Sequence, residues 1–131
     1  MQASFLVNAN FFGRLALEVA YSSGDRWLDH LTRHISGNID LVCGFAARSL
    51  PGITPMRPDA SFLVWLDARE LDAKVGDVHR FLVERAGVNL YDGRVYGPGG
   101  EGFIRLNVGC PRSVLENALT RIMNGSLGSS Q

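Results

Sequence analysis

Hydrophobic residues recur along the chain with two different periods, and these periods predict long helices that lead into a small sheet domain. Over residues 25–49, apolar side chains follow at steps of three or four, the spacing of one helix face. They are Leu28, Leu31, Ile35, Ile39, Val42 and Phe45. Asp25 is a candidate N-cap at the start of this pattern. The pattern as a whole predicts one long helix of roughly 35 Å.

A shorter apolar segment precedes this helix. Residues 10–21 contain Leu15, Leu17 and Val19 among small residues, which predicts a mostly buried helix that Ser22-Ser23-Gly24 ends. Residues 1–7 are apolar without the charged region or cleavage site of a targeting peptide, and their structure is left unassigned.

The second half of the chain alternates between strand and helix signals. Residues 61–67 are apolar on both faces, which predicts a central strand covered on each side, and residues 53–56 suit a short edge strand. Asp77 is expected to cap a helix that ends at Gly87 and leads to a strand over residues 88–90. This succession predicts a βαβ unit.

A last helix is expected to follow the final strand. It begins at Pro111 or Ser113, and Ser113 with Glu116 has the spacing of a capping box. Its buried stripe is Leu115, Ala118, Leu119, Ile122 and Met123, before Asn124-Gly125. The predicted fold class is α/β: long N-terminal helices leading into a small α/β sandwich, with helices packed on a mixed sheet. Its segments are 1–24 (helical), 25–50 (connecting helix), 51–124 (α/β domain) and 125–131 (flexible tail).

Arg105 is the main candidate for a binding residue. Read with period two, Ile104, Leu106 and Val108 point to the core, so Arg105 points to the opposite face with Phe103 and Asn107. A guanidinium held in a strand needs an anion, and its planar fork grips a carboxylate with two parallel hydrogen bonds.

Two anions are possible for Arg105. One is a carboxylate of the protein, from Asp59, Asp67 or Glu101, and the other is the carboxylate of a ligand. The pattern alone favours the internal salt bridge, because most charged strand residues are structural or solvated.

Composition narrows the function classes. The chain has 13 Lys or Arg and 13 Asp or Glu residues, spread along its length, which argues against binding to nucleic acid or an anionic membrane. No apolar run approaches the ~20 residues of a membrane span. Cys43 and Cys110 lie far apart without metal-type spacing, so we expect a cytoplasmic protein with reduced thiols. Lys74 is the only lysine.

Three other motifs carry weaker hypotheses. His30 and His34 have the spacing of a helical metal pair but lack a third ligand, so no metal site is predicted. The glycine-rich run over residues 97–102 opens into a strand, whereas a phosphate cradle needs a helix N-terminus, so it is interpreted as a hinge or lid. Cys110 has no neighbouring base and is interpreted as inert.

Several long, ordered motifs together resemble a known family. They are Asn10-Phe-Phe-Gly13, Glu18-Val-Ala-Tyr21, Gly24-Asp-Arg-Trp-Leu-Asp29, Gly37-Asn38, Pro58-Asp-Ala-Ser-Phe-Leu-Val-Trp-Leu-Asp67, Gly97-Pro-Gly-Gly-Glu-Gly-Phe-Ile-Arg-Leu-Asn107 and Cys110-Pro-Arg112. Across nearly the whole chain they resemble the C-terminal, small domain of fold type I pyridoxal-phosphate enzymes, the class I and II aminotransferases. Within these, the resemblance is to the cystathionine β-lyase and maltose-regulon modulator type.

The resemblance implies roles for particular residues. Arg105 matches the arginine that binds the α-carboxylate of an amino-acid substrate, and residues 25–49 match the helix that connects the two domains. Tyr91, Tyr96 and Asn107 are possible pocket-shaping residues, although ordinary turn and packing roles are equally open for the two tyrosines. The implied reaction is β-elimination of a sulfur leaving group or transamination, and family members are typically homodimers.

The cofactor machinery of the family has no counterpart here. It consists of the aldimine lysine, the aspartate at the pyridine nitrogen, the stacking aromatic residue and the phosphate cradle. Lys74 has neither the context nor the position of that lysine. We therefore expect no catalytic residue, and no pyridoxal phosphate bound to this chain alone. Two hypotheses follow: part of a carbon–sulfur lyase or aminotransferase that needs a larger cofactor domain or companion chain, or a non-catalytic remnant that binds amino acids or proteins.

Overall fold

The computed structural model describes residues 10–127, which form two compact units. One unit comprises the residues up to His34, and the other begins at Ile35. The division falls inside the long helix α2, Asp25–Ser49. Residues 1–7, left unassigned above, and the last part of the predicted tail lie outside the described residues.

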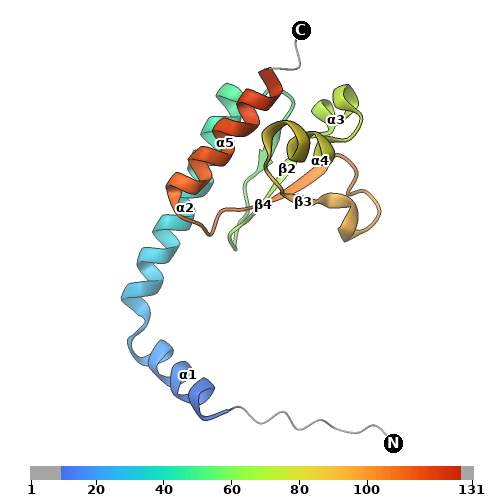
Figure 1. Cartoon of the computed structure of the whole chain (residues 1–131). Helices are drawn as coiled ribbons and strands as arrows, with labels where there is room; N and C mark the ends of the chain where they lie inside the picture. Colours follow the sequence, from blue (N-terminus) through green and yellow to red (C-terminus); the bar gives the residue numbers. More distant parts are fainter. Residues whose placement is uncertain (1–9, 128–131) are drawn as a thin grey trace, which may run out of the picture. The chain divides into compact units, whose positions relative to one another are not determined.

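The first unit contains helix α1, Phe11–Ser23, and the start of α2 (Figure 1). The Asn10 side-chain oxygen accepts a hydrogen bond from the Gly13 N–H at 2.7 Å and caps α1, while Gly24 follows its last turn. The predicted helix is confirmed, although it begins one residue later and ends two residues later than residues 10–21. The expected burial is wrong: every residue of α1 is exposed, including Phe12 at 78% and Tyr21 at 84%. An apolar helix face is buried only when another element packs on it, and the described residues place none there.

The second unit is built on a four-stranded sheet. The strands are β1, Thr54–Met56, β2, Leu63–Asp67, β3, Tyr91–Asp92, and β4, Phe103–Asn107, in the order β1-β2-β4-β3. All three pairings are antiparallel, so the α/β class is confirmed and the mixed sheet is corrected. Because β2 and β3 both run antiparallel to β4, they share one direction but do not pair. The expected βαβ unit is therefore split by β4.

The connection from β2 to β3 contains more helix and less strand than predicted. Helix α3, Arg69–Val75, was not predicted. The Asp77 carboxylate accepts the Arg80 N–H and caps α4, Val78–Phe81, as expected, and the chain continues through the π-helical turn η1, Leu82–Ala86. The strand predicted over residues 88–90 is absent, because pairing with β4 begins only at Tyr91.

Helix α5, Arg112–Leu127, closes the unit and extends beyond the predicted end at Asn124-Gly125. The capping box is wrong, because the helix begins before Ser113 and this residue lies in its first turn. The carbonyl of Pro111 instead accepts the N–H groups of Val114 and Leu115. The predicted stripe is confirmed by Leu115, Leu119 and Ile122, each 1% exposed.

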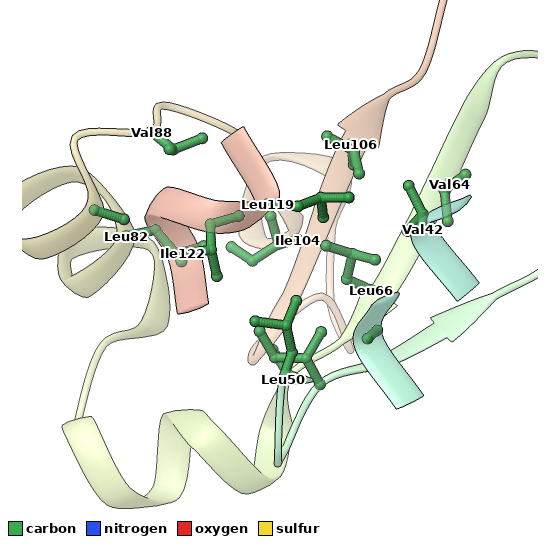
Figure 2. Packing of buried hydrophobic residues seen from close by; sticks show 14 of the residues in the cluster. Val42, Leu50, Val64, Leu66, Leu82, Val88, Ile104, Leu106, Leu119 and Ile122 are labelled. Atoms are coloured by element: carbon green, nitrogen blue, oxygen red, sulfur yellow. The ribbon is translucent and has the colours of Figure 1, made fainter. Parts of the chain in front are cut away.

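One face of the sheet carries the core. The buried side chains of β2 and β4 meet those of α2, α4, η1 and α5 (Figure 2). Among them are Val42, Val64, Leu66, Leu82, Ile104, Leu106, Leu119 and Ile122. The opposite face is only partly covered, with Leu63 and Trp65 half-buried, so the expectation that β2 is covered on both sides is wrong within the described residues.

A buried polar residue fastens α2 to the segment after β4. Asn38 is fully buried, and its side-chain amide donates to the carbonyl oxygens of Val108 at 2.9 Å and Cys110 at 3.0 Å. These bonds satisfy backbone acceptors that follow the last paired strand residue, and they position the turn that leads into α5.

This arrangement predicts the effect of removing the amide donor. Asn38→Asp should lower the free energy of unfolding by about 2–4 kcal/mol, because a carboxylate cannot donate to two carbonyl oxygens and is costly to bury. Urea denaturation followed by circular dichroism measures the change. Asn117→Asp, the same substitution at an exposed position of α5, is the matched control. Equal stability of the two variants would contradict the structural role of Asn38.

Candidate functional site

The partly covered face of the sheet carries a row of four side chains, one from each strand. In the register of the sheet, Met56 lies opposite Trp65, Trp65 opposite Arg105, and Arg105 opposite Tyr91. Residues opposite one another on neighbouring strands project to the same side. Arg105, on the inner strand β4, is therefore flanked by an aromatic residue on each side.

The guanidinium of Arg105 contacts two phenol rings. Its central carbon is 4.5 Å from the ring centre of Tyr91 and 4.6 Å from that of Tyr96. The side chain is half-buried, and its Nε is buried without a hydrogen-bond partner. Two aromatic contacts and a buried Nε leave the two terminal nitrogens as the groups through which an anion can bind.

The internal salt bridge favoured by pattern alone is not formed. Asp67 binds Arg69 instead, at 2.7 Å, and the Glu101 carboxylate accepts the N–H of Gly99 at 3.1 Å. Within residues 10–127, Arg105 makes no ion pair with Asp59 or any other carboxylate. Arg69 on the same face, by contrast, already has its anion and lies 5.0 Å from the ring centre of Phe103.

A shallow hollow of about 310 Å³ adjoins this row. Its walls are Met56, Trp65, Gly93, Tyr96, Gly97, Pro98, Gly99, Gly100 and Phe103. The ring centres of Tyr96 and Trp65 lie 5.3 Å apart in an edge-to-face contact, and Tyr96 both lines the hollow and contacts the guanidinium. The lining is aromatic side chains, one thioether and glycine-rich backbone, which suits an uncharged group.

The glycine-rich loop beside Tyr96 is packed against the turn that carries this residue. Tyr96 ends the 3₁₀ turn η2, Gly93–Tyr96. A Cβ atom on Gly93 would lie 2.3 Å from the Gly100 carbonyl oxygen and 2.6 Å from that of Phe103, which is closer than any side chain tolerates. Glycine is therefore required where the turn and the loop meet.

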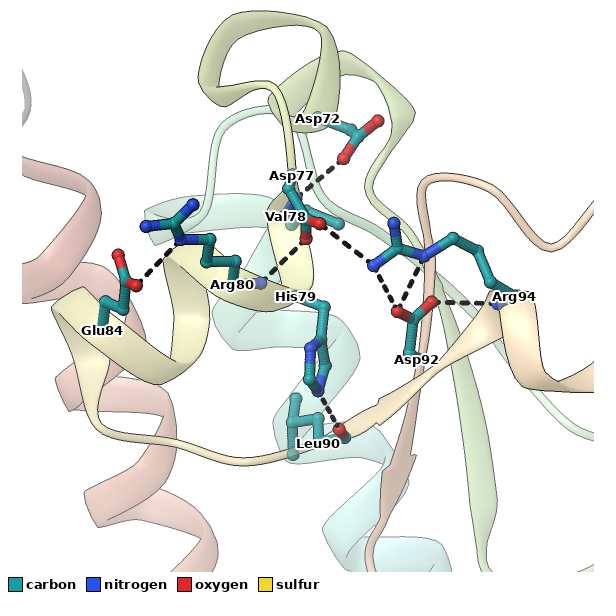
Figure 3. A network of polar contacts seen from close by, with 9 residues as sticks. All are labelled: Asp72, Asp77, Val78, His79, Arg80, Glu84, Leu90, Asp92 and Arg94. Carbon is teal, nitrogen blue, oxygen red and sulfur yellow. Dashed lines mark hydrogen bonds and ion pairs between the residues drawn. The ribbon is translucent and has the colours of Figure 1, made fainter.

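A polar network connects the same turn to helix α4 (Figure 3). Arg94 donates through Nε to Asp92 at 2.8 Å and through a terminal nitrogen to Asp77 at 3.0 Å. The hydrogen bond from Arg94 holds the pKa of Asp92 below its usual value. The pKa of Asp77 is lowered first by the Arg80 N–H and then by Arg94. Both carboxyl groups are therefore ionised at neutral pH.

The other predicted residues lie in different surroundings. Asn107 is exposed at the end of β4, where its side-chain oxygen accepts the Gly109 N–H at 2.8 Å, and it does not line the hollow. Lys74 is exposed on α3, in a groove with Asp77, Arg80 and Glu84, and is not among the residues around Arg105.

Sequence reasoning missed part of the site. The sequence pattern indicates only sheet positions for Trp65, Met56 and Phe103, although the pairing of β2 with both β1 and β4 brings all three beside Arg105 or the hollow. The signal was the period-two alternation, which puts Trp65 and Arg105 on outward positions, but their pairing depends on strand order.

Residues 10–127 contain neither a candidate metal site nor a candidate membrane-spanning helix. No group of three or more His, Cys, Asp or Glu side chains in this range could hold a metal ion, and His30 and His34 belong to no such group. None of the described helices has the length and apolar character needed to cross a membrane.

Comparisons with known proteins bear on the whole chain. No family model matches it. Cystathionine β-lyase PatB of Bacillus subtilis is 39% identical over 122 residues, which cover 93% of this chain and 32% of that protein. Protein MalY of Escherichia coli is 34% identical over 105 residues, covering 80% of this chain and 27% of that protein.

A solved structure of a pyridoxal-phosphate protein is also similar to this chain. Cystalysin from Treponema denticola, whose structure contains pyridoxal 5′-phosphate, matches with a TM-score of 0.83 and 28% identity, over 91% of this chain and 30% of that chain. The chain spans about a third of the length of the relatives it matches. The chain therefore belongs to the cystathionine β-lyase and MalY group of fold type I pyridoxal-phosphate enzymes, of whose length it matches about a third.

Proposed function

We propose that this chain supplies the carboxylate-binding part of a pyridoxal-phosphate-dependent carbon–sulfur β-lyase or aminotransferase, and that Arg105 binds the α-carboxylate of the amino-acid substrate. The observation that carries the proposal is the guanidinium in contact with Tyr91 and Tyr96 without an internal anion. The implied substrates are amino acids with a sulfur leaving group, or amino donors in a transamination.

The contacts of Arg105 favour one binding geometry. The central carbon of the guanidinium lies over the rings of both Tyr91 and Tyr96, and the buried Nε is out of reach, so a carboxylate meets the two terminal nitrogens. Charge-assisted hydrogen bonds of this kind contribute about 1.5–3 kcal/mol. Tyr91 and Tyr96 shape the site in this proposal, whereas Asn107 lies further along the strand.

In this proposal, residues 10–127 do not hold pyridoxal phosphate by themselves. The aldimine requires a lysine, and Lys74 is exposed on α3 among charged side chains and away from those that contact Arg105. When bound in the complete enzyme, the cofactor supplies the electron sink for bond cleavage at the substrate. In the proposal, the larger part of the enzyme holds it, and this chain orients the substrate.

The exposed apolar side chains of α1 support the proposal that another polypeptide packs on this helix. Phe11, Phe12 and Tyr21 are each more than two-thirds exposed, at 74%, 78% and 84%. Such surface is characteristic of an interaction site. We propose that the larger cofactor-binding part, or a companion chain, packs on α1, within a homodimeric assembly in the cytoplasm.

The proposed role of Arg105 predicts a selective loss of carboxylate binding. Arg105→Ala should weaken binding of L-alanine or acetate by about 10–100-fold, because the charge-assisted bonds are lost. Nuclear magnetic resonance titration of the chain at constant ionic strength measures the affinity. The matched control is Arg69→Ala, since Arg69 lies on the same face but is already paired with Asp67.

The stability of the same variants separates binding from folding. Arg105→Ala loses two cation–π contacts and should lower the free energy of unfolding by only about 1–2 kcal/mol. A variant that unfolds, or that binds the carboxylate as tightly as the Arg69→Ala control, would be incompatible with the proposed role.

The cofactor assignment predicts the result of reductive trapping. After incubation with pyridoxal phosphate and reduction with borohydride, intact-mass measurement should show no saturable adduct at Lys74, because this amine is exposed to water in a groove of charged side chains. Lys74→Arg, which leaves the chain without lysine side chains, gives the background from the terminal amine. A stoichiometric adduct on the unmodified chain that the substitution abolishes would refute the assignment.

A further inference from the structure

We propose that Arg94 is a positioning residue for Arg105. By joining Asp92 and Asp77, it fixes turn η2 so that the Tyr96 ring stays over the guanidinium. This inference rests on the proposed carboxylate-binding role of Arg105 and adds a residue that touches neither ligand nor guanidinium.

The first step concerns what Arg94 is attached to. Its backbone N–H donates to Asp92 at 2.9 Å, and its side chain donates to the same carboxylate and to Asp77 (Figure 3). Asp77 is the N-cap of α4, and the first residue of that helix, Val78, is 3% exposed. One guanidinium fork therefore attaches a surface turn to a helix that is anchored in the core.

The second step leads from Arg94 to the ring of Tyr96. Both residues lie in the same 3₁₀ turn, and the Arg94 carbonyl accepts the Gly97 N–H at 3.3 Å, directly after Tyr96. Tyr96 is 48% exposed, and its ring contacts are those with Trp65 and Arg105. The position of the ring therefore depends mainly on the conformation of the turn.

The two rings around Arg105 are held in different ways, which makes the inference specific. Tyr91 belongs to β3 and is the direct pairing partner of Arg105 in the sheet register. Tyr96 has no place in the sheet. The loss of Arg94 should therefore displace one ring and leave the other, a pattern that general destabilisation would not produce.

The chain offers a matched control for the loss of a surface arginine. Arg80 lies on α4 and pairs with Glu84 at 2.8 Å, four residues further on, without touching η2. Removing Arg80 deletes the same charge and a similar exposed ion pair, but not the connection between Asp77 and Asp92.

The test compares Arg94→Ala, Arg94→Lys and Arg80→Ala in the full chain by nuclear magnetic resonance. In Arg94→Ala we expect loss of the nuclear Overhauser contacts between Tyr96 and Arg105, retention of those between Tyr91 and Arg105, and about 3–10-fold weaker acetate binding. Arg94→Lys should restore part of the affinity, because a single ammonium replaces the fork. Arg80→Ala should match the unmodified chain in every readout.

The outcomes separate this inference from the function on which it rests. If the unmodified chain and Arg105→Ala bind acetate equally, both the proposed function and the positioning role are overturned. If Arg105→Ala abolishes binding while Arg94→Ala keeps the Tyr96 contacts and the affinity, only the positioning role is overturned. Loss of the Tyr91 and Tyr96 contacts together in Arg94→Ala would also overturn it, since the residue would then stabilise the whole fold.

Discussion

A half-buried guanidinium without a carboxylate partner is the feature on which the rest of the site depends. Partial burial removes some of the hydration of the Arg105 guanidinium, so the protein must compensate with other contacts. The two phenol rings do so through cation–π attraction, worth about 0.5–1 kcal/mol each at partly exposed positions. Rings can cover the faces of a guanidinium but cannot accept its in-plane hydrogen bonds. In the proposed role, the terminal nitrogens of Arg105 donate these bonds to the carboxylate of a ligand.

Side chains alternate between the two faces of the sheet along each strand. The residues that stabilise the fold therefore lie on one face, and the proposed binding residue lies on the other. Ile104 and Leu106 of β4 point into the core and are almost completely buried, at 1% and 4% exposed. Arg105 stands between them on the other face. Because the buried residues on both sides fix the backbone of β4, the guanidinium is mounted on a rigid element, whereas Tyr96 is carried by a turn that needs its own attachments.

Local sequence patterns predict the features that depend on a single helix or strand. They do not predict which elements pack or pair with one another. Helix α2, the stripe of α5 and the outward direction of Arg105 follow from periodicity alone. The insertion of β4 between β2 and β3 could not be predicted, because a strand gives no sign of its neighbours. For the same reason, the pairing of Trp65 with Arg105 and the absence of the salt bridge with Asp67 became visible only in the structure. Asp67 has a closer partner, Arg69, two residues away.

The partly covered face of the sheet bears on how strongly the proposed carboxylate site at Arg105 can bind a ligand. Water competes with a ligand for every hydrogen bond that an exposed guanidinium donates. The attraction between charges also weakens as the surrounding dielectric rises. The relatives are about three times longer than the part matched here, so they contain much structure that could exclude water from such a site. In the proposed role, Arg105 fixes the direction and geometry of carboxylate binding within this chain. The strength of the interaction depends on what covers the open face of the sheet, since the same two hydrogen bonds gain energy as water is removed.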